Sequence, residues 1–161
     1  EIQKLFCSLK LSSALYIRNY AMVHLAYSLG LRPVEICGIS LDDISFKKRE
    51  LTLRGRKGNN PTRLPIPEHT IKAITAYVIG VRPKTKYRDL FLTLKAPYRP
   101  ISPNTVAHCT KASMKEAGLC GSAYWLRHTY AQNLLESGLR VFEIKEMMGH
   151  DKIESSVTFF C

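Results

Sequence analysis

The stretch Leu29-Gly30-Leu31-Arg32-Pro33-Val34-Glu35 forms the corner around which the rest of this sequence is arranged. Residues 13–29 carry apolar side chains at helical spacing, and the glycine that follows them is placed to end a helix. Pro33 restricts the preceding residue to an extended backbone and suits the first position of a new helix. We therefore predict helices over 13–29 and 33–39, with Arg32 held in a stiff corner between them.

Downstream of this corner the sequence predicts a small sheet followed by helices. Short strands are expected at 44–46, 51–54 and 63–66, with turn residues throughout the connecting segment 55–61. Caps and helical periodicity predict helices at 68–79, 103–117, 123–137 and 141–148, and a last helix capped by Asp151. The expected fold class is mainly α with a small antiparallel β-sheet (α+β).

The chain length and composition are those of one globular domain. With 161 residues it is long enough for one hydrophobic core and too short for two comfortable domains. The longest nearly apolar run, residues 21–30, is about half as long as a membrane-spanning helix, so we expect no membrane partner and a cytoplasmic location. The five cysteines include no C-x-x-C pair, which supports neither a disulfide framework nor a metal site.

The charge balance favours a polyanionic partner. The chain has 24 Lys and Arg against 13 Asp and Glu, a net charge of +11. Alternatively, the positive charge serves only to keep the protein soluble, but the clustering of the basic residues favours a nucleic-acid partner. Between residues 47 and 63 only one acid, Glu50, interrupts them, and a second group follows at 82–88. The predicted DNA-binding residues from the first cluster are Lys47, Lys48, Arg54, Arg56 and Arg63.

Four polar residues stand at structural corners and suit a phosphate ligand. Arg32 precedes a proline, Lys57 lies in a glycine-flanked turn, Arg127 lies in a helix, and His150 follows a helix-ending glycine. The planar fork of arginine donates two hydrogen bonds to a phosphate and stays charged, whereas lysine is a mobile point charge that also gives up a proton. Each residue alone could be a solvated surface residue, but four on a basic chain favour phosphate binding.

The motifs around the two arginines resemble those of a known family. Residues 29–39 resemble the G-L-R-x-x-E-x-x-x-L box of tyrosine recombinases of the phage-integrase type. Arg32 matches the first catalytic arginine of that box, and Glu35 matches its acidic residue. Residues 126–131, Leu-Arg-His-Thr-Tyr-Ala, are close to the second arginine box, in which Arg127 matches the second catalytic arginine.

Two further motifs extend this resemblance over nearly the whole chain. Residues 54–59 resemble the turn between two strands whose lysine protonates the leaving 5′ oxygen, and Lys57 matches that lysine. Met148-Gly149-His150 matches the family's L-G-H, whose histidine binds a non-bridging phosphate oxygen. The resemblance implies a single tyrosine-recombinase catalytic domain over 1–161, with the family's N-terminal DNA-binding domain and C-terminal tail missing.

The family mechanism would then be implied. A tyrosine attacks a phosphate of double-stranded DNA, forms a 3′-phosphotyrosyl bond and frees a 5′ hydroxyl that later attacks a partner strand. No metal or other cofactor takes part. The resemblance also implies site-specific recombination, in integration or excision of a mobile element, nucleoid association, and a homotetramer on DNA for the full-length protein. We expect the fragment itself to be monomeric.

The sequence departs from the family at two positions. Tyr124 stands where the family most often has the histidine of H-x-x-R, and it is either a variant phosphate contact or an aromatic residue packed beside Trp125. Phe159 stands nine residues after His150, where the nucleophilic tyrosine is expected, and it has no oxygen with which to attack. The chain as written should therefore bind the phosphate without cutting it.

Three interpretations of Phe159 remain open at this stage. It is a deliberate Tyr→Phe replacement, or it belongs to a naturally inactive DNA-binding paralogue, or another tyrosine such as Tyr124 or Tyr130 is the nucleophile. A rival outside the family is a basic RNA- or nucleoid-binding domain, which predicts that Arg32 and Arg127 do not converge.

Overall fold

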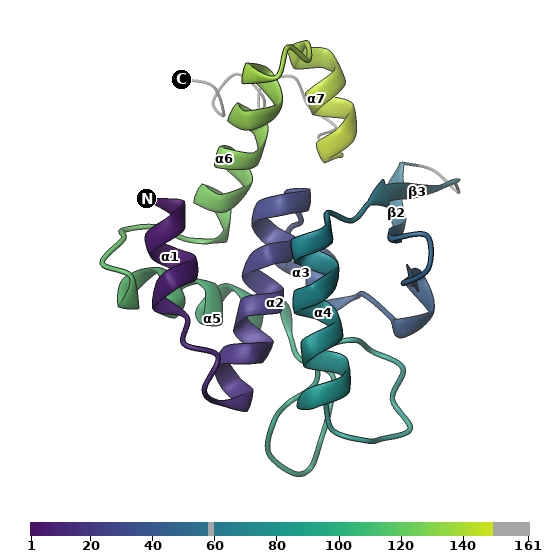
Figure 1. Cartoon of the computed structure of the whole chain (residues 1–161). Helices are drawn as coiled ribbons and strands as arrows, with labels where there is room; N and C mark the ends of the chain where they lie inside the picture. Colours follow the sequence, from purple (N-terminus) through teal and green to yellow (C-terminus); the bar gives the residue numbers. More distant parts are fainter. Residues whose placement is uncertain (58–59, 150–161) are drawn as a thin grey trace.

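The computed structural model describes residues 1–57 and 60–149 (Figure 1). It is mainly α with a small antiparallel sheet, as predicted. The helices are α1 (Ile2–Ser8), α2 (Ala14–Leu29), α3 (Pro33–Cys37), α4 (Glu68–Gly80), α5 (Pro103–Glu116), α6 (Ala123–Glu136) and α7 (Val141–Met148), with a 3-10 turn η1 (Leu41–Asp43). The strands are β1 (Ile44–Ser45), β2 (Glu50–Lys57) and β3 (Asn60–Pro65). The helix predicted after Asp151 lies outside the described residues.

The helix ends follow the predicted caps closely. The side chain of Ser102 caps α5, and glycines in the left-handed region end α2 and α7. Ser13, which was predicted to be the first residue of the helix over 13–29, is instead the N-cap of α2. Helix α3 stops at Cys37, two residues before its predicted end, because Gly38 already takes the C-cap position. The short helix α1 was not predicted, and only one of its residues, Leu5, is buried.

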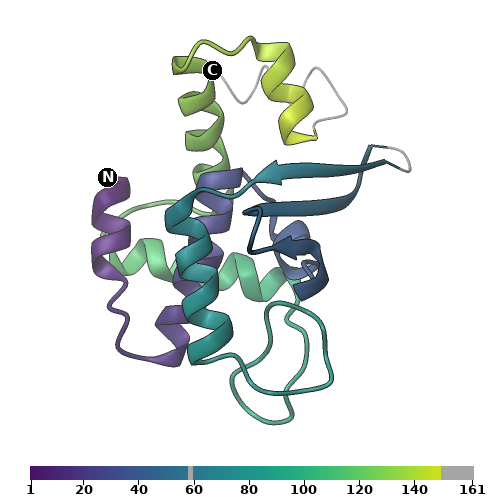
Figure 2. The same cartoon turned by 45° about the vertical axis from the view of Figure 1, so that its right-hand side comes forward.

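The prediction of a continuous turn over 55–61 is wrong. Strand β2 continues to Lys57 and pairs with Asn60 at the start of β3, after an irregularity in register between Leu53 and Lys57. Gly55 lies inside this irregular section with φ +83, a conformation that glycine adopts without strain. The hairpin therefore reaches further than the turn residues suggested, and it passes below α7 (Figure 2).

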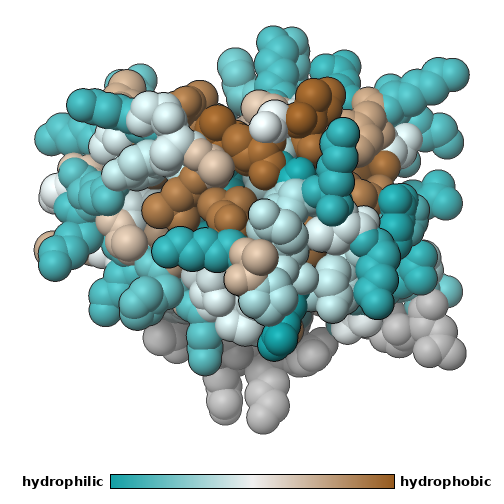
Figure 3. Space-filling model, turned by 90° about the horizontal axis from the view of Figure 1, so that it is seen from below, coloured by the Kyte–Doolittle hydropathy of each residue, from teal (hydrophilic) through white to brown (hydrophobic). Residues whose placement is uncertain are grey.

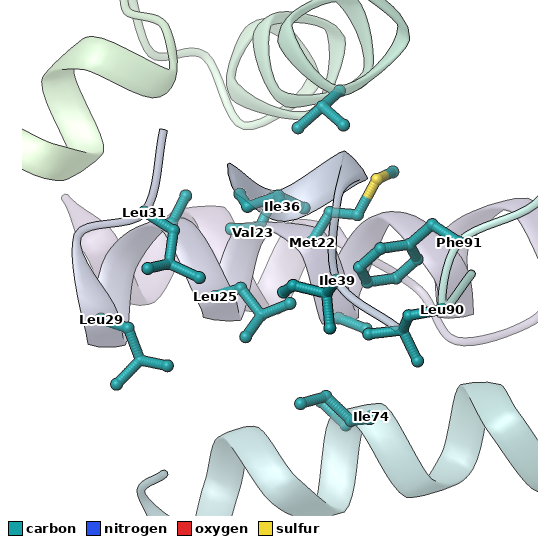
Figure 4. Close-up of a cluster of buried hydrophobic side chains, with 14 of the residues drawn as sticks. Met22, Val23, Leu25, Leu29, Leu31, Ile36, Ile39, Ile74, Leu90 and Phe91 are labelled. Carbon is teal, nitrogen blue, oxygen red and sulfur yellow. The ribbon is translucent and has the colours of Figure 1, made fainter. Parts of the chain in front are cut away.

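Helix α2 is the centre of the core. Residues 21–26 are all buried, because α4, α5 and α6 pack around this helix. Figure 4 shows its apolar side chains meeting those of the α2–α3 corner, of α3 and of the segment at Leu90 and Phe91, with Ile74 of α4 opposite. The corner at Arg32 is thus joined directly to the buried core.

The surface is largely hydrophilic. Seen from below, apolar residues gather near the upper centre of this face, with hydrophilic residues around them (Figure 3). In the part of the chain that the structure describes, no helix has both the length and the apolar character that crossing a membrane requires.

We predict that Gly30 tolerates no side chain. It ends α2 with φ +61, and a Cβ built on it would lie 2.3 Å from Cδ1 of Tyr130 on α6. Gly118 has a similar φ, +72, but open space around it. Gly118→Ala should therefore cost about 1 kcal/mol from backbone strain, and Gly30→Ala a further ~1–3 kcal/mol from overpacking. Urea unfolding measures both, and equal losses would contradict the predicted clash.

A second prediction concerns His24, which is 6% exposed among the rings of Phe6 and Tyr20. Burial, and then the nearby charge of His69, lower its pKa from 6.5 to about 4. The unfolded chain therefore takes up this proton below pH 6.5, while the folded chain resists it until about pH 4. Over that window the free energy of unfolding should fall by ~3 kcal/mol.

The matched variants for this prediction are His24→Gln and His108→Gln. His108→Gln removes an exposed histidine of α5 and leaves the buried ring of His24 in place, so the pH dependence that comes from His24 should remain. His24→Gln should remove most of it. If both variants keep the same pH dependence of unfolding, the acid sensitivity has another source.

Candidate active site

Three arginines and one glutamate meet where the α2–α3 corner, strand β2 and helices α6 and α7 come together. Glu35 binds both Arg32 and Arg56, and the charges of these three residues all act on the buried guanidinium of Arg127. The predicted pair Arg32 and Arg127 therefore shares one region. The rival interpretation, in which the two do not converge, is contradicted.

Arg32 has the extended backbone that Pro33 was expected to impose, with φ −75 and ψ 153. Its backbone N–H donates to Oε2 of Glu35 at 2.8 Å, and its side-chain Nη2 donates to Oε1 of Glu35 at 3.1 Å. Its side chain is 42% exposed, while its Nε is buried and has no hydrogen-bond partner among the described residues. The guanidinium is thus fixed on one side and still has donors for a ligand.

Arg127 is held by backbone carbonyls. Its Nε donates to the carbonyl of Gly30 at 2.7 Å and its Nη2 to that of Met148 at 3.5 Å. The residue is only 6% exposed, and burial lowers its pKa to about 10. The charge of Glu35 opposes that shift, so the guanidinium stays protonated at neutral pH. Arg127 thus ties α6 to the α2 corner and to the end of α7.

Arg56 was predicted to bind DNA, but the structure places its side chain inside the protein. Its Nε and Nη2 donate to the two oxygens of Glu35 at 2.7 and 2.9 Å, and its Nη1 donates to the carbonyl of Met147. Its side chain is 3% exposed. Leu51 and Leu53 are buried, so strict alternation along the strand would place Arg56 on the exposed face, and its burial was not predicted. A glycine inside a strand, such as Gly55, is the usual signal of a bulge that reverses side-chain direction.

The site has an excess of positive charge. The carboxylate of Glu35 binds the guanidiniums of Arg32 and Arg56 and acts through its charge on that of Arg127, and its own pKa is lowered from 4.5 to about 2. Burial opposes this shift, but hydrogen bonds from the Arg56 side chain and the Arg32 N–H, together with their charges, outweigh it. Since one negative charge cannot neutralise three positive ones, the described part of the site is suited to a bound anion.

Other predicted residues lie at or beyond the edge of this cluster. Tyr124 is 55% exposed on the first turn of α6, which favours a ligand contact over packing beside Trp125. The backbone of Lys57 ends β2, but its side chain lies outside the described residues, as do His150 and Phe159. Of the predicted DNA-binding residues, four have exposed side chains: Lys47, Lys48, Arg54 and Arg63.

We predict that Glu35 is important for stability above pH 4.5. Because its pKa is lowered on folding, its contribution is present above 4.5 and is lost as the pH falls through 2. Glu35→Gln should lower the free energy of unfolding by ~3 kcal/mol at pH 7, and the difference from the parent should shrink between pH 4.5 and 2.

The matched control is Glu68→Gln. Glu68 pairs with Lys72 on α4, but both side chains are mostly exposed, at 60% and 70%. Solvent screens such a pair, so its loss should be hard to measure. Similar unfolding curves for the two variants would show that the Glu35 carboxylate is not the stabilising group that its contacts indicate.

Comparison with known proteins places the chain in a family. The chain matches the phage integrase family over residues 1–159. Tyrosine recombinase XerA of Pyrococcus furiosus is 33% identical over 141 residues, covering 87% of this chain and 49% of that protein. The chain spans about half the length of the curated relatives that it matches.

Solved structures share the fold. A crystal structure of XerA recombinase superposes with a TM-score of 0.82 at 21% identity, over 98% of this chain and 56% of that chain. The Tn1549 transposon integrase, solved as a Tyr→Phe variant with transposon right end DNA, gives 0.75 at 18% identity, over 99% and 59%. With the family matched over residues 1–159, this chain belongs to the phage integrase family.

Proposed function

We propose that residues 1–161 form the catalytic domain of a tyrosine-type site-specific recombinase that binds a phosphate of double-stranded DNA. The convergence of Arg32 and Arg127 on the α2–α3 corner, with Glu35 beside them, carries this proposal. Arg32 has free donors on a partly exposed side chain, and Arg127 supplies a buried neighbour that is charged at neutral pH. Membership of the phage integrase family also supports this proposed function.

The proposed chemistry is transfer of a phosphoryl group to a tyrosine. The tyrosine oxygen loses its proton and forms a bond to phosphorus, while the bond to the 5′ oxygen breaks and that oxygen takes up a proton. Negative charge grows on the non-bridging oxygens, where Arg32 and Arg127 stabilise it electrostatically. By its match to the family motifs, Lys57 supplies the proton and His150 binds a non-bridging oxygen.

Phe159 separates binding from cleavage in this chain. Phenylalanine has no hydroxyl, so a protein with this residue at the nucleophile position binds the phosphate and leaves the strand intact. The Tyr→Phe variant of Tn1549 integrase was solved with DNA, which supports a binding-competent form of this kind. Tyr130 is a poor substitute nucleophile, because it packs on Gly30 and burial raises its pKa.

The exposed basic residues extend the site to the flanking DNA backbone. Lys47 and Lys48 lie between β1 and β2, while Arg54 and Arg63 lie on the two strands of the hairpin. Such residues bind phosphates with little sequence information and with strong salt dependence. Arg56 is left out of this set because its side chain is buried.

The central prediction is that Phe159→Tyr restores strand cleavage. Incubation with a nicked suicide substrate should give a covalent protein–DNA adduct that survives denaturing electrophoresis. Arg127→Ala in the same background should abolish it, because one charge is removed where the transition state becomes more negative. Absence of an adduct with any cognate DNA would reject the recombinase reaction.

A naturally inactive DNA-binding paralogue is the second candidate, and Phe159 itself favours it. The two candidates differ in the codon at position 159 of the source gene. A native Tyr codon identifies Phe159 as a replacement, whereas a native Phe codon together with an inert Phe159→Tyr protein identifies a binder that does not cleave.

We also predict that DNA binding depends on the hairpin side of the molecule. Replacing Lys47 and Lys48 together by Ala should lower the slope of log K against log salt by about 2, since each lysine neutralises one phosphate. The control replaces Lys111 and Lys115, which are exposed on α5 and lie outside the basic cluster of residues 47–63. Fluorescence anisotropy over a salt series measures both, and equal slopes would place the DNA elsewhere.

A further inference from the structure

Arg56 lies inside the proposed site without contributing to the phosphate chemistry described above. Its Nε and Nη2 donate to Glu35, and its Nη1 donates to the carbonyl of Met147. With a side chain only 3% exposed, it has no surface to offer to DNA. Its three bonded nitrogens are all directed at acceptors within the protein.

Arg56 joins three separate elements of the fold. It is part of β2, binds Glu35 of α3, and contacts the end of α7 through both Met147 and Gly149. A Cβ built on Gly149 would lie 3.2 Å from Cδ of Arg56, so this C-cap residue of α7 lies directly against the aliphatic part of the Arg56 side chain. The catalytic-motif residue that follows in the sequence is His150.

The contact with Glu35 extends the influence of Arg56 to Arg32. Each oxygen of Glu35 accepts two hydrogen bonds, one from Arg32 and one from Arg56. Oε1 accepts from Arg32 Nη2 and Arg56 Nε, and Oε2 accepts from the backbone N–H of Arg32 and from Arg56 Nη2. The fork of Arg56 thereby fixes the plane of the carboxylate. That plane in turn sets the direction in which Arg32 presents its remaining donors.

We infer that Arg56 is a positioning residue, which orients Arg32 through Glu35 and holds the end of α7 against the site. This inference rests on the proposed function and deepens it. Lysine cannot take this role, because a single ammonium neither spans both carboxylate oxygens nor also reaches a carbonyl of α7 in the same geometry. Loss of the fork should therefore impair the reaction more than it impairs DNA binding.

The test compares Arg56→Lys with Arg140→Lys, both in the Phe159→Tyr background. Arg140 pairs with Glu143 on α7, but its side chain is 85% exposed, so it is an arginine–glutamate pair outside the site. At saturating suicide substrate, Arg56→Lys should slow adduct formation on the order of 10- to 100-fold, while Kd for intact duplex changes about twofold at most. Arg140→Lys should change neither quantity.

The opposite pattern overturns the inference. If Arg56→Lys raises Kd and leaves the rate at saturation unchanged, Arg56 is a DNA contact. If it changes neither quantity, the fork has no role in positioning. Thermal unfolding of both variants at the assay temperature shows whether a slow rate reflects loss of folded protein.

A second measurement needs no cleavage and uses the chain with Phe159. Inorganic phosphate is titrated while NMR follows the Nε–Hε signals of Arg32 and Arg127. Phosphate should shift both signals in the parent and in Arg140→Lys, but only that of Arg127 in Arg56→Lys. An unchanged response of Arg32 would reject positioning through Glu35. If this response is lost while Phe159→Tyr forms no adduct, the proposed reaction fails and the positioning role stands.

Discussion

The carboxylate of Glu35 is the interaction on which the arrangement of the site depends. It accepts four hydrogen bonds from two arginines, and its pKa falls to about 2 even though it is largely buried. A site for a phosphate must hold several positive charges close together before the ligand arrives, and these charges repel one another. One internal carboxylate reduces that repulsion and still leaves the site positive.

The backbone of the α2–α3 corner also positions the arginines of the site. Gly30 turns the chain with φ +61, and its carbonyl accepts a hydrogen bond from Nε of Arg127. Because glycine has no side chain, there is room beside it for the ring of Tyr130. Two residues later, Arg32 is held extended by Pro33 and capped by Glu35. Because α2 is buried between three helices, the corner cannot shift without disturbing the core. The rigidity of the site is therefore a consequence of where the core lies.

The parts of this structure that could be predicted are those governed by local chemistry. The caps at Ser102, Gly30 and Gly149 and the restriction at Arg32 depend on residues close in sequence, and the structure has them as expected. The direction of the Arg56 side chain depends on a bulge and on partners 21 and 91 positions away. A basic residue in a basic hairpin suggests a surface contact, and only the fold shows that a buried acid faces it.

In the proposed function, phosphate binding and bond making depend on different residues of this chain. The contacts that hold Arg32, Arg56 and Arg127 end on backbone carbonyls and on Glu35. None of these hydrogen bonds requires a hydroxyl at position 159, since tyrosine and phenylalanine differ only in that oxygen. The arrangement of charges in the described site is thus independent of the side chain at position 159. Under the proposed function, a chain with phenylalanine there would keep the means to bind a phosphate, and the proposed cleavage would depend on the presence of a single oxygen atom.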